Sequence, residues 1–344
     1  MPRYLSGIQP SGRPHLGNYF GAMVQHLEAA QRAAPGGDDA LFFIADLHAL
    51  TTVTDAALVR THVQDVAASY LALGLDTSRC HFFRQSDIPE VTELTWLLST
   101  CTGMGLLERA HSYKDKTARG IPASVGLFTY PVPMAADILI YDADVVPVGK
   151  DQVQHIEMTQ DMAGHFNTRW GTAERPLLRR PEWQLSTTPK VPGTDGEKMS
   201  KSYDNTIWIF EEGKALKKAV NAIVTDSRLP EEPKDPDTVN AFLLLELFLS
   251  PDESKDWRAR LTAGGSGAPG YGDLKKALMA KMDERFGAAR ERYRTFLPGG
   301  PHHVDAEELL QTSAGRARAL AQDVLGRCYE AVGMPNAARR LRRG

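Results

Sequence analysis

The chain has 344 residues, with 40 basic and 43 acidic side chains and a formal net charge of −3. A hydrophobic content of 42% is ordinary for a folded protein, which excludes a disordered chain, a collagen-like chain and a long coiled coil. The length favours about two domains. The near-neutral charge argues against a surface that is basic everywhere, and it leaves room for a local basic patch.

Three cysteines, Cys80, Cys101 and Cys328, are too few for a disulfide framework and form no Cys-x-x-Cys pair. We therefore expect no structural metal site and a reducing, cytoplasmic location. The N-terminus lacks the apolar run of a signal peptide. The longest apolar run, residues 241–249, is far shorter than the ~20 residues of a membrane span. We expect neither a membrane nor DNA as a partner.

The first half of the chain alternates short apolar runs with helical periodicity. Strands are expected at residues 3–8, 40–45, 81–83 and 144–148, and helices at residues 16–30 and 151–170. The run at 40–45 is continuously apolar, which is typical of a strand buried on both faces. Strand–helix alternation of this kind predicts an α/β domain with a doubly wound parallel sheet.

The second half differs in composition. After about Ser202 the chain is rich in Lys, Glu, Leu and Ala, which favours helices. Helices are expected at residues 211–224, 238–248, 272–296 and 306–331, and loops at residues 228–236 and 264–270. A segment rich in Pro and Gly at 188–197 marks the boundary. We expect one domain over residues 1–197 and an all-helical domain over 198–304, with residues 305–344 packing back on the first.

A turn rich in Gly, Pro and Ser follows the first expected strand. It reads Gly7-Ile8-Gln9-Pro10-Ser11-Gly12 and leads into His15-Leu16-Gly17-Asn18 at the start of the first helix. In a doubly wound sheet this turn faces phosphate, because N–H groups at a helix N-terminus attract anions and glycines allow close approach. His15 and Asn18 are three residues apart and can face one ligand. For His15 alone, a surface histidine is the simpler interpretation.

A second motif, Lys198-Met199-Ser200-Lys201-Ser202, lies in a segment flanked by Gly and Pro. Two lysines three residues apart can neutralise the charge that develops when a triphosphate is attacked, a reaction catalysed mostly by positioning and electrostatics. Taken alone, the pentamer can also be an exposed basic loop. The presence of both motifs in one chain argues against that simpler interpretation.

The two motifs resemble the signatures of class I aminoacyl-tRNA synthetases, namely a His-Ile-Gly-His-type helix start and a Lys-Met-Ser-Lys-Ser loop. The resemblance is closest to tryptophanyl-tRNA synthetases and covers nearly the whole chain. It rests on segments that occur in the same order, which are residues 7–12, 16–19, 129–131, 134–139, 146–149, 151–152, 224–227 and 270–272.

This resemblance implies a Rossmann-like catalytic domain over residues 1–197, and a lysine loop with a helical, anticodon-binding domain over residues 198–304. It implies a homodimer that uses L-tryptophan, tRNA(Trp) and ATP, with Mg2+ carried by ATP rather than by a protein metal site. Candidate contacts to tRNA phosphates are Lys214, Lys217, Lys218, Lys275, Lys276 and the arginine-rich segment after Ala314.

The resemblance also implies roles for individual residues that bind ATP. Those expected to act on its phosphates during catalysis are His15, Asn18, Lys116, Lys198 and Lys201. The other residues expected at ATP are Gln9, Ser11, Gly17, Gly149, Asp151, Met199, Ser200 and Ser202, with Gln9 close to the reacting carboxylate.

The amino-acid pocket decides between tryptophan and tyrosine. A buried carboxylate at Asp137 can accept the indole N–H, and leaving it unpaired costs ~1–3 kcal/mol, so phenylalanine would be rejected. The residues expected around tryptophan are Gly7, His48, Tyr130, Met134, Asp137, Val146, Val148 and Gln152. From the residues alone, Asp137 can also be a helix-capping or ion-paired aspartate, and His48 a satisfied interior histidine.

Several positions depart from the family pattern, among them His15, where threonine is common, and Tyr203-Asp204, which replaces the usual Asp-Pro after the lysine loop. Lys150 stands where an acidic residue is more usual beside the ribose, and Leu5 stands where a larger aromatic residue is expected. Three hypotheses remain: a tryptophan–tRNA ligase, a tyrosine–tRNA ligase on the same fold, and a synthetase-like binding or regulatory protein. The intact residues of the two motifs argue against the third, because a pure binder does not need them.

Overall fold

The computed structural model describes residues 2–110, 113, 124–172, 176–185, 191–335 and 337. These residues form a five-stranded sheet in the order β3-β2-β1-β4-β5, in which every neighbouring pair is parallel. The strands are β1 (Tyr4–Ile8), β2 (Ala40–Ile44), β3 (His81–Arg84), β4 (Val145–Val148) and β5 (Glu182–Leu185). The predicted doubly wound α/β fold is confirmed.

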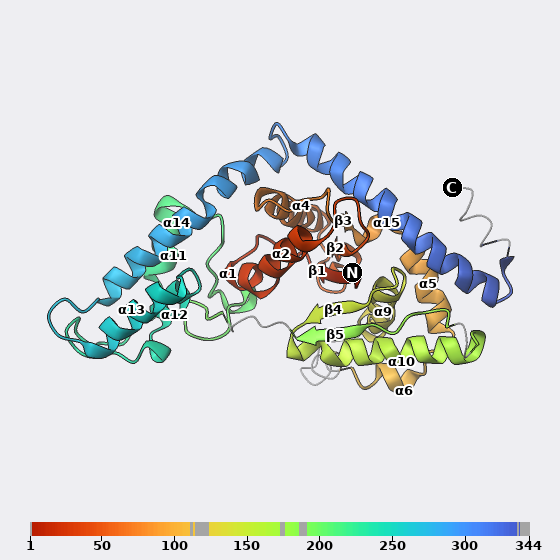
Figure 1. The fold of residues 1–344 in the computed structure, drawn as a ribbon, viewed down its shortest axis with the longest axis horizontal. Helices are drawn as coiled ribbons and strands as arrows, with labels where there is room; N and C mark the ends of the chain where they lie inside the picture. Colours follow the sequence, from red (N-terminus) through yellow and green to blue (C-terminus); the bar gives the residue numbers. More distant parts are fainter. Residues whose placement is uncertain are drawn as a thin grey trace.

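Strand β2 shows why the middle of the sheet is apolar. Leu41 and Phe43 pack into one hydrophobic core, and Phe42 and Ile44 pack into another. Alternate side chains of a strand point to opposite faces, so a strand covered on both sides must be apolar throughout. The helices of one face are α2 (Val24–Arg32) and α4 (Ala56–Ala72), and those of the other are α5 (Glu90–Ser99), α9 (Pro131–Leu139), α10 (Val153–Trp170) and α15 (His303–Ala331) (Figure 1).

Shorter helical segments connect these layers. The first crossover is helical from Leu16 to Arg32, because α1 (Leu16–Asn18) and the π-helical turn η1 (Tyr19–Met23) lead directly into α2. The remaining short segments are α3 (Asp46–Ala49), η2 (Gln85–Asp87), α6 (Met104–Leu107), α8 (Val125–Thr129), η3 (Lys150–Gln152), η4 (Lys201–Tyr203) and η5 (Pro236–Thr238).

The second half of the chain is helical, and it is docked on α4. Its helices are α11 (Gly213–Asn221), α12 (Asn240–Glu246), α13 (Pro251–Ala263) and α14 (Tyr271–Phe296). The hydroxyl of Tyr293 on α14 donates to Asp65 Oδ1 at 2.7 Å, and Arg292 Nε donates to the carbonyl of Ala72 at 2.8 Å. Both acceptors belong to α4, so these bonds join the helical domain to the α/β domain.

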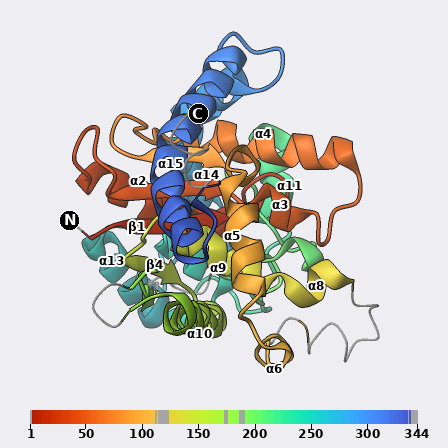
Figure 2. The same cartoon turned by 90° about the vertical axis from the view of Figure 1, so that its right-hand side faces the viewer.

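Helix α15 returns to the α/β domain and lies beside β3 and α5 (Figures 1 and 2). Arg318 on α15 holds the buried carboxylate of Glu90 through a forked pair of hydrogen bonds. Arg327 pairs with Asp142. The apolar residues that α15 adds to this core are Ala314, Ala317, Ala321, Val324, Leu325 and Cys328.

Among the described elements, α4, α5, β5 and α13 were not in the sequence expectations. Strand β5 was not expected, because all four of its residues are exposed and it forms the edge of the sheet. Helix α13 was not expected, because Leu261 is its one buried residue and supplies no apolar stripe. Part of the expected domain boundary, residues 188–190, lies outside the described residues.

Candidate active site

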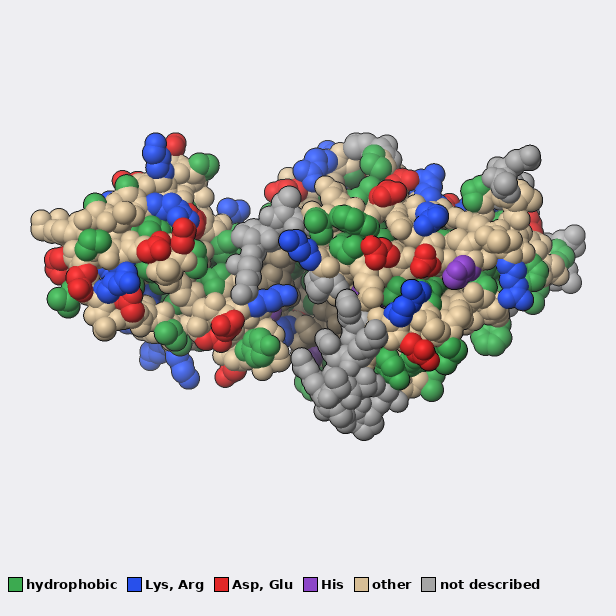
Figure 3. Space-filling model, turned by 90° about the horizontal axis from the view of Figure 1, so that it is seen from below, with side chains coloured by type: hydrophobic (Ala, Val, Ile, Leu, Met, Phe, Trp, Pro, Cys, Tyr) green, Lys and Arg blue, Asp and Glu red, His purple; other side chains and the backbone are tan. Residues whose placement is uncertain are grey.

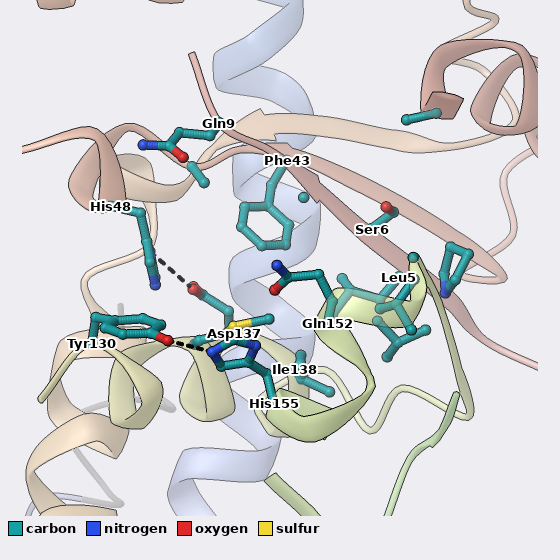
Figure 4. A pocket seen from close by; sticks show the side chains of 18 of the residues that line it. Leu5, Ser6, Gln9, Phe43, His48, Tyr130, Asp137, Ile138, Gln152 and His155 are labelled. Atoms are coloured by element: carbon teal, nitrogen blue, oxygen red, sulfur yellow. Dashed lines mark hydrogen bonds and ion pairs between the residues drawn. The ribbon is translucent and has the colours of Figure 1, made fainter. Parts of the chain in front are cut away.

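A cavity of about 470 Å³ opens at the carboxyl ends of β1 and β4. These strands are neighbours, and their crossover helices cover opposite faces of the sheet, so the cavity lies at the topological switch point where doubly wound folds bind ligands. The cavity wall requires glycine at Gly7, because a Cβ there would lie 2.5 Å from the ring of Phe43. Side chains from the strands and from the helices beyond them converge on this space (Figure 4).

The cavity brings together the residues that were predicted around tryptophan, although they lie far apart in the sequence. Those that line it are Gly7, His48, Tyr130, Met134, Asp137, Val146, Val148 and Gln152. Gln9 and Gly149, which were predicted at ATP, line it as well. Leu5, where a larger aromatic was expected, is also part of the wall and is 1% exposed.

Asp137 is a buried carboxylate in this cavity, with 3% of its surface exposed, and it rises from α9 toward His48 (Figure 4). Gln85 Nε2 donates to Asp137 Oδ2 at 2.7 Å and lies 2.9 Å from His48 Nδ1. Burial raises the pKa of Asp137 well above its usual range, although the hydrogen bond from Gln85 opposes this shift. Burial lowers the pKa of His48, so its ring is neutral at pH 7.

Tyr130 and His155 form a second polar pair in the cavity. The Tyr130 hydroxyl is hydrogen-bonded to His155 Nε2, and the two rings lie 5.4 Å apart (Figure 4). His155 is buried on α10, so it fixes the direction of the Tyr130 hydroxyl. The cavity therefore combines apolar walls with polar groups at fixed positions, as expected of a small-molecule site.

His15 caps the N-terminus of α1 in a reciprocal arrangement. Its Nδ1 accepts the Asn18 N–H at 3.3 Å, while Asn18 Oδ1 accepts the His15 N–H at 3.1 Å. Burial, together with the charge of Lys201, lowers the pKa of His15 to about 4. The ring is therefore neutral at pH 7, and the helix start that was predicted to face phosphate is rigid.

The lysine loop packs directly on this helix start. The Gly17 N–H lies 3.4 Å from Met199 Sδ, and a Cβ on Gly17 would lie 2.9 Å from the His15 ring and 3.4 Å from Met199 Cβ. The buried side chain of Asn205 is hydrogen-bonded to the backbone of the loop. Its Oδ1 accepts the Ser200 N–H at 2.8 Å, and its Nδ2 donates to the Lys198 carbonyl at 3.2 Å.

Lys201 reaches the first motif. Its Nζ donates to Ser11 Oγ at 3.1 Å and lies 5.3 Å from the centroid of the Trp208 ring. Burial lowers the pKa of Lys201 to about 8, with Asp65 raising it and Arg13 lowering it further. The lysine therefore keeps its charge at pH 7 and lies where the two motifs meet.

The other predicted ATP residues lie around this contact or outside the described part of the chain. The side chain of Lys198 is exposed, and the hydroxyls of Ser200 and Ser202 lie 2.8 Å apart. Lys116 and the side chain of Asp151 lie outside the described residues. Viewed from below, the molecule is hollowed between its two domains, and Lys and Arg side chains stand at the margin of this hollow (Figure 3).

Sequence reasoning missed several residues that hold the site together, namely Gln85, His155, Asn205 and Trp208. Gln85 follows a buried strand at the edge where ligands bind, and this position is the one signal that could have indicated it. His155 lies three residues after Gln152, on the same side of the start of α10. Asn205 and Trp208 have no local pattern that marks them.

The chain matches the family of tRNA synthetases class I (W and Y) over residues 1–287, and it belongs to this family. Over 332 residues it is 49% identical to the tryptophan–tRNA ligase of Rhodopirellula baltica, an alignment that covers 96% of this chain and 99% of that one. Over 338 residues it is 48% identical to the tryptophan–tRNA ligase of Fusobacterium nucleatum, and this alignment covers 97% of this chain and 98% of that one.

A solved structure gives the same result. The tryptophanyl-tRNA synthetase of Campylobacter jejuni, in complex with ADP and tryptophan, superposes with a TM-score of 0.85 at 44% identity. The alignment covers 96% of this chain and 99% of that chain. None of the described helices combines the length and apolarity that a membrane span needs.

Proposed function

We propose that this chain is a tryptophan–tRNA ligase. It activates L-tryptophan with ATP to tryptophanyl-adenylate and transfers the amino acid to the 3′ end of tRNA(Trp), releasing AMP and pyrophosphate. The observation that carries the proposal is that the cavity and the lysine loop meet along one turn, residues 9–11. Gln9 lines the cavity that contains Asp137, and Ser11, two residues further on, accepts a hydrogen bond from Lys201. A carboxylate in the cavity and a triphosphate beside the lysine loop therefore meet near Gln9.

Activation requires one displacement at phosphorus. A carboxylate oxygen of tryptophan attacks the α-phosphorus of ATP, and the bond to the oxygen that bridges to the β-phosphate breaks. Pyrophosphate leaves with that electron pair, so the protein supplies charge and position rather than a nucleophile. Lys201 neutralises the leaving group, and the side chains of His15 and Asn18 bind the phosphates from the start of α1. The N–H groups of Leu16, Gly17 and Asn18 are themselves engaged within the protein.

Mg2+ arrives with ATP as part of the substrate. Among the described residues, no group of three or more His, Cys, Asp and Glu side chains could hold a metal ion. The ATP phosphates supply the oxygen ligands that Mg2+ prefers. The described cysteines, Cys80, Cys101 and Cys328, are free thiols, which suits the reducing environment of the cytoplasm.

The amino acid is selected by shape and by one polar contact. Met134, Val146 and Val148 supply apolar walls, and Asp137 supplies an acceptor for the indole N–H. Tyr130, at the start of α9, and Gln152, at the start of α10, line the same cavity and bind the ammonium group in this proposal. A carboxylate among apolar walls favours an amino acid whose large apolar side chain carries a single donor.

ATP–pyrophosphate exchange measured with each of the twenty amino acids tests this proposal. Tryptophan should support exchange, and tyrosine should not do so at comparable concentrations. Exchange that depends on tyrosine would identify the tyrosine enzyme instead. Binding of tryptophan without any exchange would indicate the binding or regulatory protein.

The tRNA should contact α11. Lys214, Lys217 and Lys218 are exposed there, whereas Lys275 donates to the carbonyls of Asn221 and Ile223 within the protein. Contacts to phosphates release counterions, so tRNA binding should fall steeply with salt. Replacing the three α11 lysines by alanine should weaken tRNA binding and reduce its salt dependence, while pyrophosphate exchange stays unchanged. Equal salt dependence in the variant would exclude this face.

We propose a homodimer that uses the surface of α5, α6 and α8. Trp96, Met104 and Val125 on these helices are largely exposed apolar side chains, and Trp96 is 69% exposed. Helices α5 and α6 lie on the side of the molecule that faces the viewer in Figure 2. Light scattering on the wild type and on Trp96→Asp tests this, because a buried charge would dissociate the dimer. A wild-type monomer, or an intact dimer in the variant, would contradict it.

A further inference from the structure

Gln85 lies behind Asp137, outside the wall of the cavity, and its amide can adopt one orientation. Its Oε1 lies 3.1 Å from the Leu47 N–H nitrogen and 3.3 Å from that of His48. A backbone N–H can donate and cannot accept, so the oxygen of the amide must face these two groups. The side chain is 1% exposed, so water cannot satisfy the alternative orientation.

With the oxygen fixed, both hydrogens of Nε2 have defined acceptors. One hydrogen points to Asp137 Oδ2 at 2.7 Å, and the other points to His48 Nδ1 at 2.9 Å. His48 Nδ1 is therefore an acceptor, and the proton of this neutral ring lies on Nε2. Although His48 Nδ1 and Asp137 Oδ2 are 3.7 Å apart, they are not an ion pair, because both accept from the same amide nitrogen.

We infer that Gln85 is a positioning residue for recognition of the indole N–H: it occupies Asp137 Oδ2, leaves Asp137 Oδ1 for the substrate, and fixes the tautomer of His48. This inference rests on the proposed function. Within the described residues, Asp137 Oδ1 accepts no hydrogen bond. A carboxylate that lines the cavity and has one oxygen occupied has one acceptor site to offer, which matches the single N–H of indole.

The charge of Asp137 depends on its neighbours. Asp46 and His48 on α3 interact with Asp137, as does Tyr141 after the end of α9. Tyr130 and His155 line the same cavity. On neighbouring segments, Glu90 is paired with Arg318, and Arg84 with Asp87 and Glu307. Burial raises the pKa of Asp137, and the hydrogen bond from Gln85 lowers it. Removing this donor should therefore raise the pKa of Asp137 further and favour its protonated form.

The test compares tryptophan with β-(3-benzothienyl)alanine, in which sulfur replaces the indole N–H. Gln85→Met removes the amide and nearly keeps the length of the side chain. In pyrophosphate exchange, kcat/KM for tryptophan should fall roughly tenfold, because a hydrogen bond to a charged group is lost from the acceptor, while kcat/KM for the analogue falls less than about threefold. The acid limb of the tryptophan profile should move to higher pH.

Gln160→Met is the matched control. Gln160 lies on α10 and donates to the carbonyl of Pro181 at 2.7 Å, away from the cavity. It should change neither the ratio between the two substrates nor the pH profile. Equal losses for tryptophan and the analogue in Gln85→Met, with an unmoved pH limb, would overturn the inference and make Gln85 a structural residue.

Gln85→Glu decides the matter if the methionine variant does not fold. Glutamate keeps the shape and accepts from Leu47 and His48, but it donates to Asp137 only while it carries a proton. The Gln85→Glu variant should therefore prefer tryptophan over the analogue most strongly at acid pH, and this preference should fall as the pH rises. In the wild type the preference should rise with pH. A preference that follows the wild-type direction would overturn the inference. If the wild type exchanges with neither substrate, the proposed function itself fails.

Discussion

The N–H of Gly17 lies 3.4 Å from the sulfur of Met199, so two motifs that are 182 residues apart in the sequence touch each other. Methionine sulfur is a weak acceptor, and the contact matters mainly because Met199 is buried against the helix start. The neighbours of Met199 in the lysine loop are thereby placed beside His15 and Ser11. Several predictions about the loop depend on this contact.

Lys201→Ala should lower kcat of adenylation by roughly 100-fold or more, with little change in the KM for tryptophan. The lysine acts on charge that develops in the transition state, and removing a single such group costs about this much. Lys214→Ala, an exposed lysine on α11, is the control and should leave pyrophosphate exchange unchanged. A raised KM for tryptophan with normal kcat would contradict this role.

The rate of adenylation should also fall on the alkaline side. Burial lowers the pKa of Lys201 to about 8, so the side chain loses its charge as the pH rises through that value. In wild-type exchange, kcat/KM for ATP, which reports the free enzyme, should therefore decline with a midpoint near pH 8. Arginine stays charged throughout this range, so the Lys201→Arg variant should show no decline near pH 8, even if its overall rate is lower. If the decline near pH 8 were unchanged in the arginine variant, it would belong to another titrating group.

Asp137→Asn should reduce kcat/KM for tryptophan roughly tenfold in a folded protein. A carboxylate can accept from Gln85 and from the indole N–H at once, whereas an amide has one oxygen and must present its NH2 group to one of these donors. Exchange kinetics measure the loss, and thermal unfolding checks that the fold is intact. Wild-type kinetics in the folded variant would remove Asp137 from the pocket.

Asn205→Ala should lower kcat by roughly tenfold, because the Ser200 N–H loses its acceptor and the lysine loop loses its support. Asn240→Ala is the matched control, since Asn240 Nδ2 donates to the carbonyls of Gly193 and Thr194 beside the loop and makes no bond to the lysine motif. Both variants should lower Tm, and Asn205→Ala alone should slow exchange. Equal kinetics in the two would show that Asn205 acts on stability only.

Arg318→Ala should destabilise the protein by ~1–3 kcal/mol at pH 7, because it leaves the buried carboxylate of Glu90 with Gln322 as its remaining side-chain partner. The lower part of this range allows for the partial exposure of Arg318. Burial raises the pKa of Glu90, but the hydrogen bonds from Arg318 and Gln322 lower it overall. This stabilisation is present above the unfolded pKa of ~4.3 and is lost as the pH falls.

Denaturant unfolding at two pH values checks this prediction. The difference between the wild type and Arg318→Ala should be largest at pH 7 and should narrow as the pH falls below the unfolded pKa of ~4.3, because protonation of Glu90 removes its pairing with Arg318. Arg260→Ala is the control, because Arg260 forms an exposed pair with Asp256 on α13. It should cost less than ~0.5 kcal/mol. A difference that does not depend on pH would show that Arg318 acts through packing alone.

The parts of the fold that were predictable are those with a strong local pattern. Strand β2 is a continuous apolar run that ends at the site, and the long helices α14 and α15 have apolar residues at helical spacing. Strand β5 is exposed and short, so it has neither property. Helix α13 does carry a signal, a Ser250–Glu253 capping box with Pro251 after it, but the signal is not supported by an apolar face.

The site residues likewise divide into those with a local sequence pattern and those without one. The glycine-rich turn and the lysine loop can be found in the sequence because phosphate chemistry requires particular residues at short spacing. The cavity walls were indicated by resemblance to a family, and periodicity would not have found Met134 or Val146. The position of Gln85 after a strand could have indicated the residue, but its role could not be predicted, because that role depends on Asp137, a residue 52 positions away that only the folded sheet brings near.

Helix α15 has a consequence for synthesis. The ribosome makes it after the other described helices, and Arg316 on this helix donates to the carbonyl of Thr77, 239 residues earlier in the chain. Until α15 emerges, the apolar side chains of β3 and α5 that it covers remain accessible to water or to chaperones. The nucleotide-binding half therefore cannot complete its core until α15 has been made, although nearly all of its own residues were translated first. Truncated products released early should be recognised as unfinished and degraded.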